Sequence, residues 1–103
     1  MTFEKYIIVT NDEKEYYKVT GTFKPISELP KAVKDGWDIE EDAQFALTII
    51  RKDWEQELIY EQKLFNEMTG KLIKNRLTKI ETNVEKLRTA KVIKVKSTYE
   101  IVR

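Results

Sequence analysis

The longest periodic pattern of hydrophobic positions in this chain lies between Asp53 and Arg88. Its first half has apolar residues three or four positions apart, with Glu61 standing where one apolar residue is missing: Trp54, Leu58, Phe65, Met68 and Leu72. Its second half continues with the same spacing: Ile73, Leu77, Ile80, Val84 and Leu87. Spacing of this kind predicts amphipathic helix.

The apolar positions of the two halves do not fit one continuous helical register, and the register changes beside Thr69–Gly70. A glycine inside a helix costs about 1 kcal/mol relative to alanine. Either two antiparallel helices meet in a tight turn at Met68–Lys71, or a single helix rotates its apolar stripe at Gly70; we favour two helical segments without requiring that they reverse direction. The stripe of residues 73–87 predicts a helix that covers the core, or a coiled-coil seam that makes a homodimer.

Shorter runs elsewhere predict β-strands. Runs rich in apolar and β-branched residues indicate strands at Phe3–Thr10, Glu15–Phe23 and Phe45–Arg51, and clean alternation of apolar and polar residues indicates a strand at Lys91–Val102. The first two strands are expected to form a hairpin. Ser27 is a candidate N-cap for a short helix that ends at Gly36. The expected fold is one α+β domain over residues 1–103, with element order β-β-α-β-α(α)-β. We expect a mainly antiparallel sheet of about four strands, with a long helix or helical hairpin on one face.

The composition excludes several kinds of chemistry. The chain has 103 residues and neither cysteine nor histidine, so nucleophile pairs built on histidine and the usual zinc ligands are ruled out. Its three glycines form no phosphate-binding loop. No signal peptide or membrane-spanning run is evident, and we expect a cytoplasmic protein. We expect no enzymatic activity, no cofactor and no metal.

An acidic cluster follows Trp37, at Asp38, Glu40, Glu41 and Asp42. It lacks the alternating ligand spacing and internal glycine of a calcium-binding loop, so the match to a metal site is weak. The cluster is either a solvated acidic loop or a surface that binds a protein partner.

Charge is divided unevenly along the chain. Residues 1–70 carry nine basic and fifteen acidic side chains, giving −6, whereas residues 71–103 carry ten and three, giving +7. The basic stripe of residues 71–96 supports nucleic-acid binding as an alternative function, through Arg76, Lys79, Lys86, Lys94 and Lys96. Alternatively, if the two helical segments are antiparallel, the carboxylates of Glu55, Glu57 and Glu61 would neutralise the positive charge of this stripe within the chain.

Aromatic residues are the other candidates for partner contact. Tyr16 and Tyr17 are neighbours, so we expect one of them, Tyr16, to point away from the core. Trp37 follows the predicted helix-ending glycine, and large aromatics often anchor protein interfaces. Core packing is the alternative interpretation for each tryptophan.

The passage 32–51 resembles part of a known family. Ala32-Val33-Lys34-Asp35-Gly36-Trp37, the acidic residues 38–42 and the predicted strand 45–51 are similar to a passage in small type II-A anti-CRISPR proteins, which phages use to inhibit Cas9. The resemblance implies that the carboxylates of the acidic cluster occupy a place where DNA would lie. Our leading hypothesis is a small non-enzymatic protein, encoded by a phage or mobile element, that inhibits or modulates a larger host protein.

Overall fold

The computed structural model describes residues 2–68 and 71–98. The strands are β1 (Thr2–Val9), β2 (Glu15–Lys18), β3 (Thr22–Pro25) and β4 (Lys91–Thr98). The helices are α1 (Glu40–Glu67) and α2 (Lys71–Thr89), with one turn of 3-10 helix, η1, at Ile26–Glu28. The α+β class and the four-stranded antiparallel sheet with a helical hairpin are as the sequence predicts.

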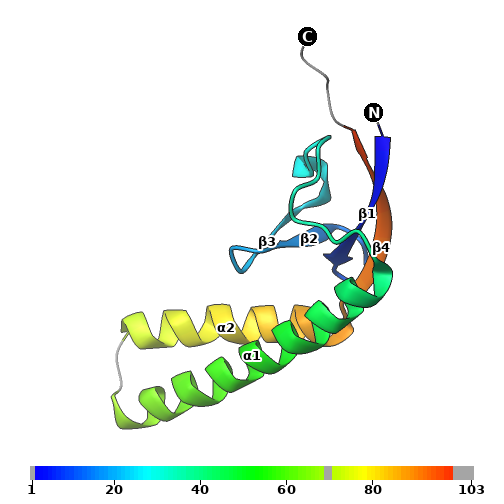
Figure 1. The fold of residues 1–103 in the computed structure, drawn as a ribbon. Helices are drawn as coiled ribbons and strands as arrows, with labels where there is room; N and C mark the ends of the chain where they lie inside the picture. Colours follow the sequence, from blue (N-terminus) through cyan, green and yellow to red (C-terminus); the bar gives the residue numbers. More distant parts are fainter. Residues whose placement is uncertain (1, 69–70, 99–103) are drawn as a thin grey trace.

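The sheet has the strand order β3-β2-β1-β4 (Figure 1). The first and last strands pair along their whole length, from Thr2 opposite Thr98 to Val9 opposite Lys91. The predicted hairpin between β1 and β2 is confirmed, with Val9 opposite Tyr16. Its turn is organised by Asp12, which accepts hydrogen bonds from the Thr10 hydroxyl at 2.6 Å and the Lys14 N–H at 3.1 Å. These two hydrogen bonds lower the pKa of Asp12.

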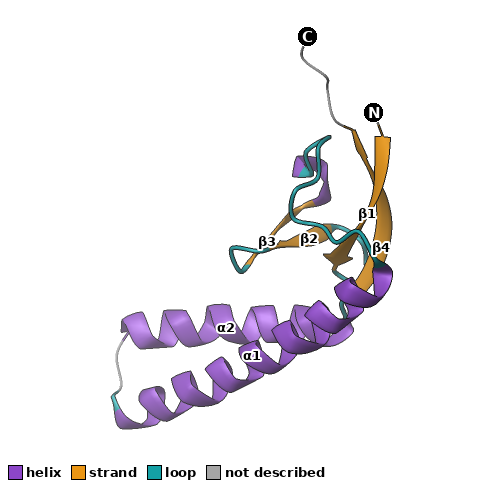
Figure 2. Ribbon diagram, viewed as in Figure 1, coloured by secondary structure: helices purple, strands orange, loops and turns teal. Residues whose placement is uncertain are grey.

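Both faces of the sheet are covered, each by a different layer. On one face Ile8 and Tyr17 pack with Leu47 of α1 and Leu87 of α2. On the other face the irregular segment 26–37 lies over the sheet (Figure 2), and its Val33 packs with three buried residues of β1 and β2: Ile7, Val9 and Tyr16. Adjacent positions of one strand can therefore both be buried.

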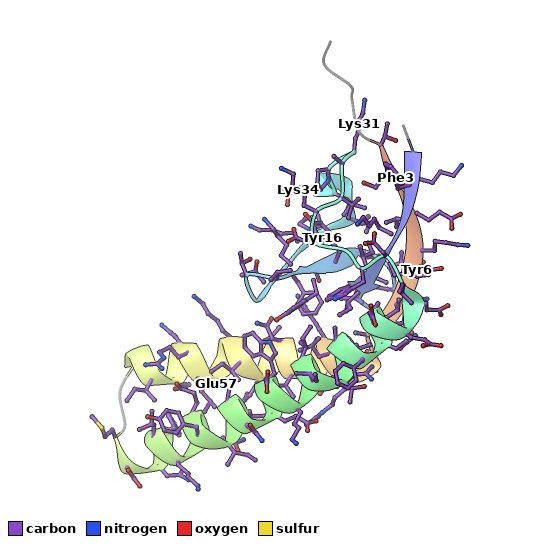
Figure 3. All side chains as sticks on the ribbon, in the orientation of Figure 1. Phe3, Tyr6, Tyr16, Lys31, Lys34 and Glu57 are labelled. Atoms are coloured by element: carbon purple, nitrogen blue, oxygen red, sulfur yellow. The ribbon has the colours of Figure 1, made fainter. Side chains whose placement is uncertain are left out.

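This arrangement corrects the expectation for the tyrosine pair. Tyr16 and Tyr17 are both buried, because the segment 26–37 provides a second core on the face that we expected to be wet. Lys31 and Lys34 of that segment lie at the surface (Figure 3). Burial raises the pKa of Tyr16, and the carboxylates of Asp35 and Glu28 raise it further.

Backbone hydrogen bonds fix the segment 26–37 to the sheet. Tyr6 and Trp37 exchange two N–H···O bonds, of 2.8 and 2.9 Å, along the part of β1 that β2 does not reach. The buried Ser97 hydroxyl accepts a bond from the Val33 N–H at 2.8 Å. A Cβ on Gly36 would lie 3.1 Å from the Cβ of Lys5, so glycine permits this close approach.

Two of the predicted elements are wrong. Phe45–Arg51 is not a strand but belongs to α1, and the fourth strand comes instead from Glu15–Phe23, which breaks at Gly21 into β2 and β3. Gly21 has φ +89°, which a glycine adopts without strain. The predicted helix after Ser27 is limited to η1, because Leu29 precedes a proline and is extended.

The two helices form an antiparallel hairpin whose far end projects beyond the sheet (Figure 1). Two helical segments, rather than one continuous helix, are therefore confirmed; the predicted tight turn at Met68–Lys71 includes residues 69–70, which lie outside the described residues. In the described part of the chain, no helix has both the length and the apolar character that spanning a bilayer would require.

Candidate functional site

The acidic cluster lies where α1 begins. Glu40, Glu41 and Asp42 occupy the first helical turn, where negative charge is favourable because the helix dipole presents its positive end. No side-chain hydrogen bond caps this end of the helix. Asp38 forms an ion pair of 2.5 Å with Lys5 on β1. The cluster is exposed, and its role in partner binding stays a prediction.

The predicted aromatic contacts are largely occupied within the chain. Tyr16 is buried, so its proposed place at a partner interface is wrong. Trp37 is half-buried and packs against the core on the helical side of the sheet. Trp54 is also half-buried, and its indole N–H donates a 3.0 Å hydrogen bond to the hydroxyl of Tyr17.

The basic stripe is mostly balanced by carboxylates from the acidic part of the chain. Arg76 pairs with Glu61 of α1, Lys86 with Glu15 at 3.0 Å, and Lys94 with Glu4 at 3.7 Å. The Lys86 ammonium also lies 5.3 Å from the centre of the Phe23 ring. The structure thus favours internal balancing of the positive charge over a continuous phosphate-binding stripe.

Two lysines of the basic stripe are not balanced by a carboxylate in the part of the chain that the structure describes. Lys79 and Lys96 are exposed, and neither forms an ion pair with another residue of the described chain. They come from different elements, α2 and β4.

The apolar stripe of residues 73–87 is directed into the chain's own interior. Ile80, Val84 and Leu87 are buried, and Ile73 and Leu77 are half-buried. This burial is the core packing that the sequence predicts as one interpretation; it does not support the dimer seam.

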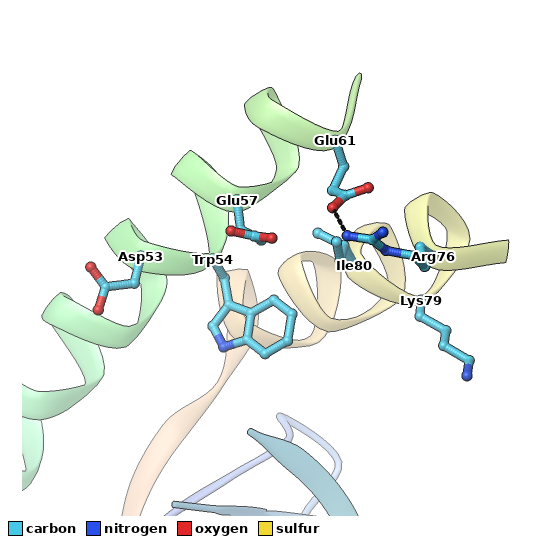
Figure 4. Close-up of a pocket in the computed structure, with 7 residues that line it drawn as sticks. All are labelled: Asp53, Trp54, Glu57, Glu61, Arg76, Lys79 and Ile80. Atoms are coloured by element: carbon cyan, nitrogen blue, oxygen red, sulfur yellow. Dashed lines mark hydrogen bonds and ion pairs between the residues drawn. The ribbon is translucent and has the colours of Figure 1, made fainter. Parts of the chain in front are cut away.

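A groove of about 500 Å³ lies between the two helices (Figure 4). Trp54 and Ile80 give it an apolar surface, and it is flanked by three carboxylates of α1 and two cations of α2: Asp53, Glu57, Glu61, Arg76 and Lys79. In Figure 4 the guanidinium of Arg76 reaches across the groove to Glu61.

Glu61 is the most unusual residue of this groove. Its side chain is fully buried, whereas the Arg76 side chain is 61 % exposed. Only Oε1 accepts from Arg76; Oε2 is buried and has no hydrogen-bond partner within the described residues. A buried carboxylate needs such partners to offset its lost hydration. The gap in the apolar periodicity of the sequence marks this residue.

A second candidate surface is the face of α1 that points away from both α2 and the sheet. Four large apolar side chains are exposed there: Phe45 (68 %), Ile49 (42 %), Ile59 (55 %) and Tyr60 (57 %). At 100° per residue they fall within an arc of about 100°. We call these four residues the outer stripe.

The outer stripe is not predicted from the sequence, because the apolar run of residues 45–51 favours a strand as well as a helix. The helical register was nevertheless present in the sequence. The core positions of α1 continue backward from Trp54 at helical spacing, through Ile50, Leu47 and Ala43. Extending that register would have placed Phe45 and Ile49 on the opposite face.

Comparison with protein-family models, with curated proteins and with solved structures finds no match for this chain. The assignment of function therefore depends on the two candidate surfaces themselves.

Proposed function

We propose that this protein acts by binding another protein, without catalysis, through the outer stripe of α1. The observation that carries the proposal is the alignment of four large apolar side chains along one exposed helical face. Single exposed apolar residues are ordinary on protein surfaces, whereas several of them on one face of the same helix are typical of an interaction site. The stripe also contains the residue types that dominate binding energy, a phenylalanine and a tyrosine.

The helix is well suited to present such a face. Leu47 and Trp54 fix the opposite side of α1 to the sheet and to Tyr17, so the outer stripe is held on a rigid support. A preformed binding face loses little conformational entropy when it binds. The charged side chains of the groove do not compete with the outer stripe as a binding site, because Glu61 and Arg76 are paired with each other and join the two helices.

Site-specific photo-cross-linking tests this proposal. A photoreactive phenylalanine analogue is placed at Phe45 or Tyr60, and in a matched control at Thr82, which is exposed on α2. In cells that express the protein, we expect positions 45 and 60 to cross-link the same protein and position 82 not to do so. Equal labelling from all three positions, or none from 45 and 60, would contradict the proposal.

The resemblance to Cas9 inhibitors gives a narrower version of this hypothesis. Its support is that Glu40, Glu41 and Asp42 are exposed carboxylates at one end of the helix that carries the outer stripe. Cleavage of a DNA target by a type II-A Cas9, measured with increasing amounts of the protein, tests it. Inhibition that disappears when these carboxylates are changed to lysine would support this version; undiminished cleavage by Cas9 would rule it out.

A further inference from the structure

We infer that the partner segment bound by the outer stripe is a basic amphipathic helix. This inference rests on the proposed function and specifies the chemistry of the partner. It follows from two independent features of α1, the spacing of its exposed apolar residues and the distribution of charge around them.

The apolar residues of the outer stripe form two pairs. Phe45 and Ile49 lie one turn apart, and Ile59 and Tyr60 lie near the other end of the helix. At 1.5 Å per residue, the centres of the first and second pairs are about 19 Å apart. Lys52 and Gln56 occupy the same face between them. A helix of about five turns, with an apolar cluster near each end, matches this spacing.

Four exposed carboxylates border the outer stripe, and we call them the flanking carboxylates. Asp42 and Asp53 lie along the border nearer the groove, which Asp53 also lines, and Glu41 and Glu55 lie along the other. None of the four forms an ion pair with another residue in the described ranges 2–68 and 71–98. A partner that carried lysine or arginine on both sides of an apolar face would pair with them.

The distribution of charge between the two helices explains why the flanking carboxylates have no ion-pair partner among the described residues. The helix α1 carries eight acidic and three basic side chains, whereas α2 carries two and six. Three basic side chains of α2 and β4 pair with carboxylates that lie outside the outer stripe: Arg76 with Glu61, Lys86 with Glu15 and Lys94 with Glu4. These pairs use carboxylates away from the outer stripe, and the four flanking carboxylates outnumber Lys52, the cation that lies between the two apolar pairs.

The same charge argues against two other occupants of the stripe. A second copy of the chain would place two acidic α1 helices face to face, and like charges across an interface are unfavourable. A membrane surface is generally anionic and would repel the flanking carboxylates. A cationic protein segment is the occupant that matches both the apolar and the charged positions.

Two synthetic helical peptides of about 18 residues test the inference. They share one leucine pattern, with cluster centres about 19 Å apart, and carry either lysine or glutamate at all the remaining positions. Each is titrated into ¹⁵N-labelled protein at low and at moderate salt, and amide shifts locate the binding site. A Phe45→Ser/Tyr60→Ser double variant tests the stripe. An Asp53→Asn/Glu55→Gln variant tests the flanks, with Glu28→Gln/Glu81→Gln as its matched control.

We expect the lysine peptide to shift amides of residues 41–60 and the glutamate peptide to leave them unchanged. The stripe variant should bind the lysine peptide at least about tenfold more weakly. Neutralising the flanks should weaken binding at low salt, and the control variant should not. Equal binding of both peptides, no binding, or shifts confined to other elements would overturn the inference.

The peptide result and the cross-linking result can fail separately. If positions 45 and 60 cross-link a partner through a segment that is not a basic helix, the proposed function stands and this inference is wrong. If the lysine peptide binds the stripe but no partner cross-links in cells, the chemistry of the surface is as inferred and the proposed function is wrong. Sedimentation of the protein and of the Phe45→Ser/Tyr60→Ser variant shows whether a second copy occupies the stripe; a dimer that this variant loses would also overturn the inference.

Discussion

Glu61 of α1 and Arg76 of α2 join the two arms of the helical hairpin through an ion pair that is buried on one side only. The carboxylate has no exposed surface, whereas the guanidinium side chain is 61 % exposed. Fifteen positions separate the two residues, and the pair forms only because the chain reverses between them. The pair therefore explains how an acidic first part and a basic last part of the sequence are combined in one fold.

Because burial is so uneven, the two partners should respond differently to substitution. Arg76→Ala leaves a buried carboxylate without its partner and should destabilise the fold by about 3–5 kcal/mol. Glu61→Leu restores the apolar periodicity, leaves an arginine that water can solvate, and removes the unpartnered oxygen. It should leave stability unchanged or raise it by about 1–2 kcal/mol. Urea unfolding followed by circular dichroism measures both.

The double variant Glu61→Leu/Arg76→Ala serves as the control. Once the buried carboxylate is gone, the loss of the arginine should have only a small effect, so the double variant should be far more stable than Arg76→Ala alone. If Glu61→Leu destabilises the protein as much as Arg76→Ala, the pair contributes net stability and our account of it is wrong.

Tyr16 should make stability sensitive to alkaline pH. Its pKa is raised from the usual value of 10.0, chiefly by burial and then by Asp35 and Glu28. The stabilisation is fully present below the pKa of an unfolded tyrosine and is lost as the pH rises through the higher pKa of the folded state. Between pH 8 and 11, Tyr16→Phe should therefore lose less stability than the unchanged protein.

Tyr60→Phe is the matched control for this experiment, because Tyr60 is exposed on α1. Lysines also titrate in this range, and comparison of the two variants removes their common effect. Stability at each pH is obtained from denaturant unfolding. Identical alkaline behaviour of Tyr16→Phe and Tyr60→Phe would show that Tyr16 does not account for the sensitivity.

Periodicity predicts the hairpin well and the beginning of α1 poorly. From Trp54 to Leu87 the core positions recur three or four residues apart over many turns, a period that a helix has and a strand does not. Between Phe45 and Ile50 every position except Thr48 is apolar, and such a run fits a buried strand as well as a helix. The helical register is recognised only by extending it backward from Trp54, and tertiary packing decides between the two.

The second core of the sheet could not be predicted from the same pattern. The segment 26–37 has almost no regular secondary structure, yet Val33 is buried in it and packs with Tyr16. Its position depends on long-range backbone bonds such as those between Trp37 and Tyr6. No local periodicity encodes such bonds, and this is why Tyr16 was assigned to the surface.

The internal ion pairs lead to a prediction about nucleic acids. With Arg76, Lys86 and Lys94 paired within the chain, the protein should bind duplex or single-stranded DNA no more tightly than about 10⁻⁴ M at physiological salt. Fluorescence anisotropy with labelled DNA and RNA, at low and moderate salt, measures this. Tight, steeply salt-dependent binding that is lost on Lys79→Glu and Lys96→Glu would favour the nucleic-acid alternative.

Residues of the outer stripe should contribute little to folding. Phe45→Ser and Tyr60→Ser remove side chains that lie mostly in water, so each should change the free energy of unfolding by less than about 0.5–1 kcal/mol. Leu47→Ala, on the opposite face of the same helix, removes a fully buried side chain and should cost about 2–5 kcal/mol. Chemical denaturation of the three variants compares them; a large loss at Phe45 or Tyr60 would assign the stripe to the fold.

The most direct test of the proposed function is the affinity of the protein for the partner that cross-linking at positions 45 and 60 identifies. Isothermal titration calorimetry compares the unchanged protein, the folded Phe45→Ser/Tyr60→Ser variant and a Thr78→Ser/Thr82→Ser control on α2. We predict that the stripe variant binds at least about tenfold more weakly and that the control binds normally. Equal affinity of all three proteins would contradict the claim that the outer face of α1 is the binding surface.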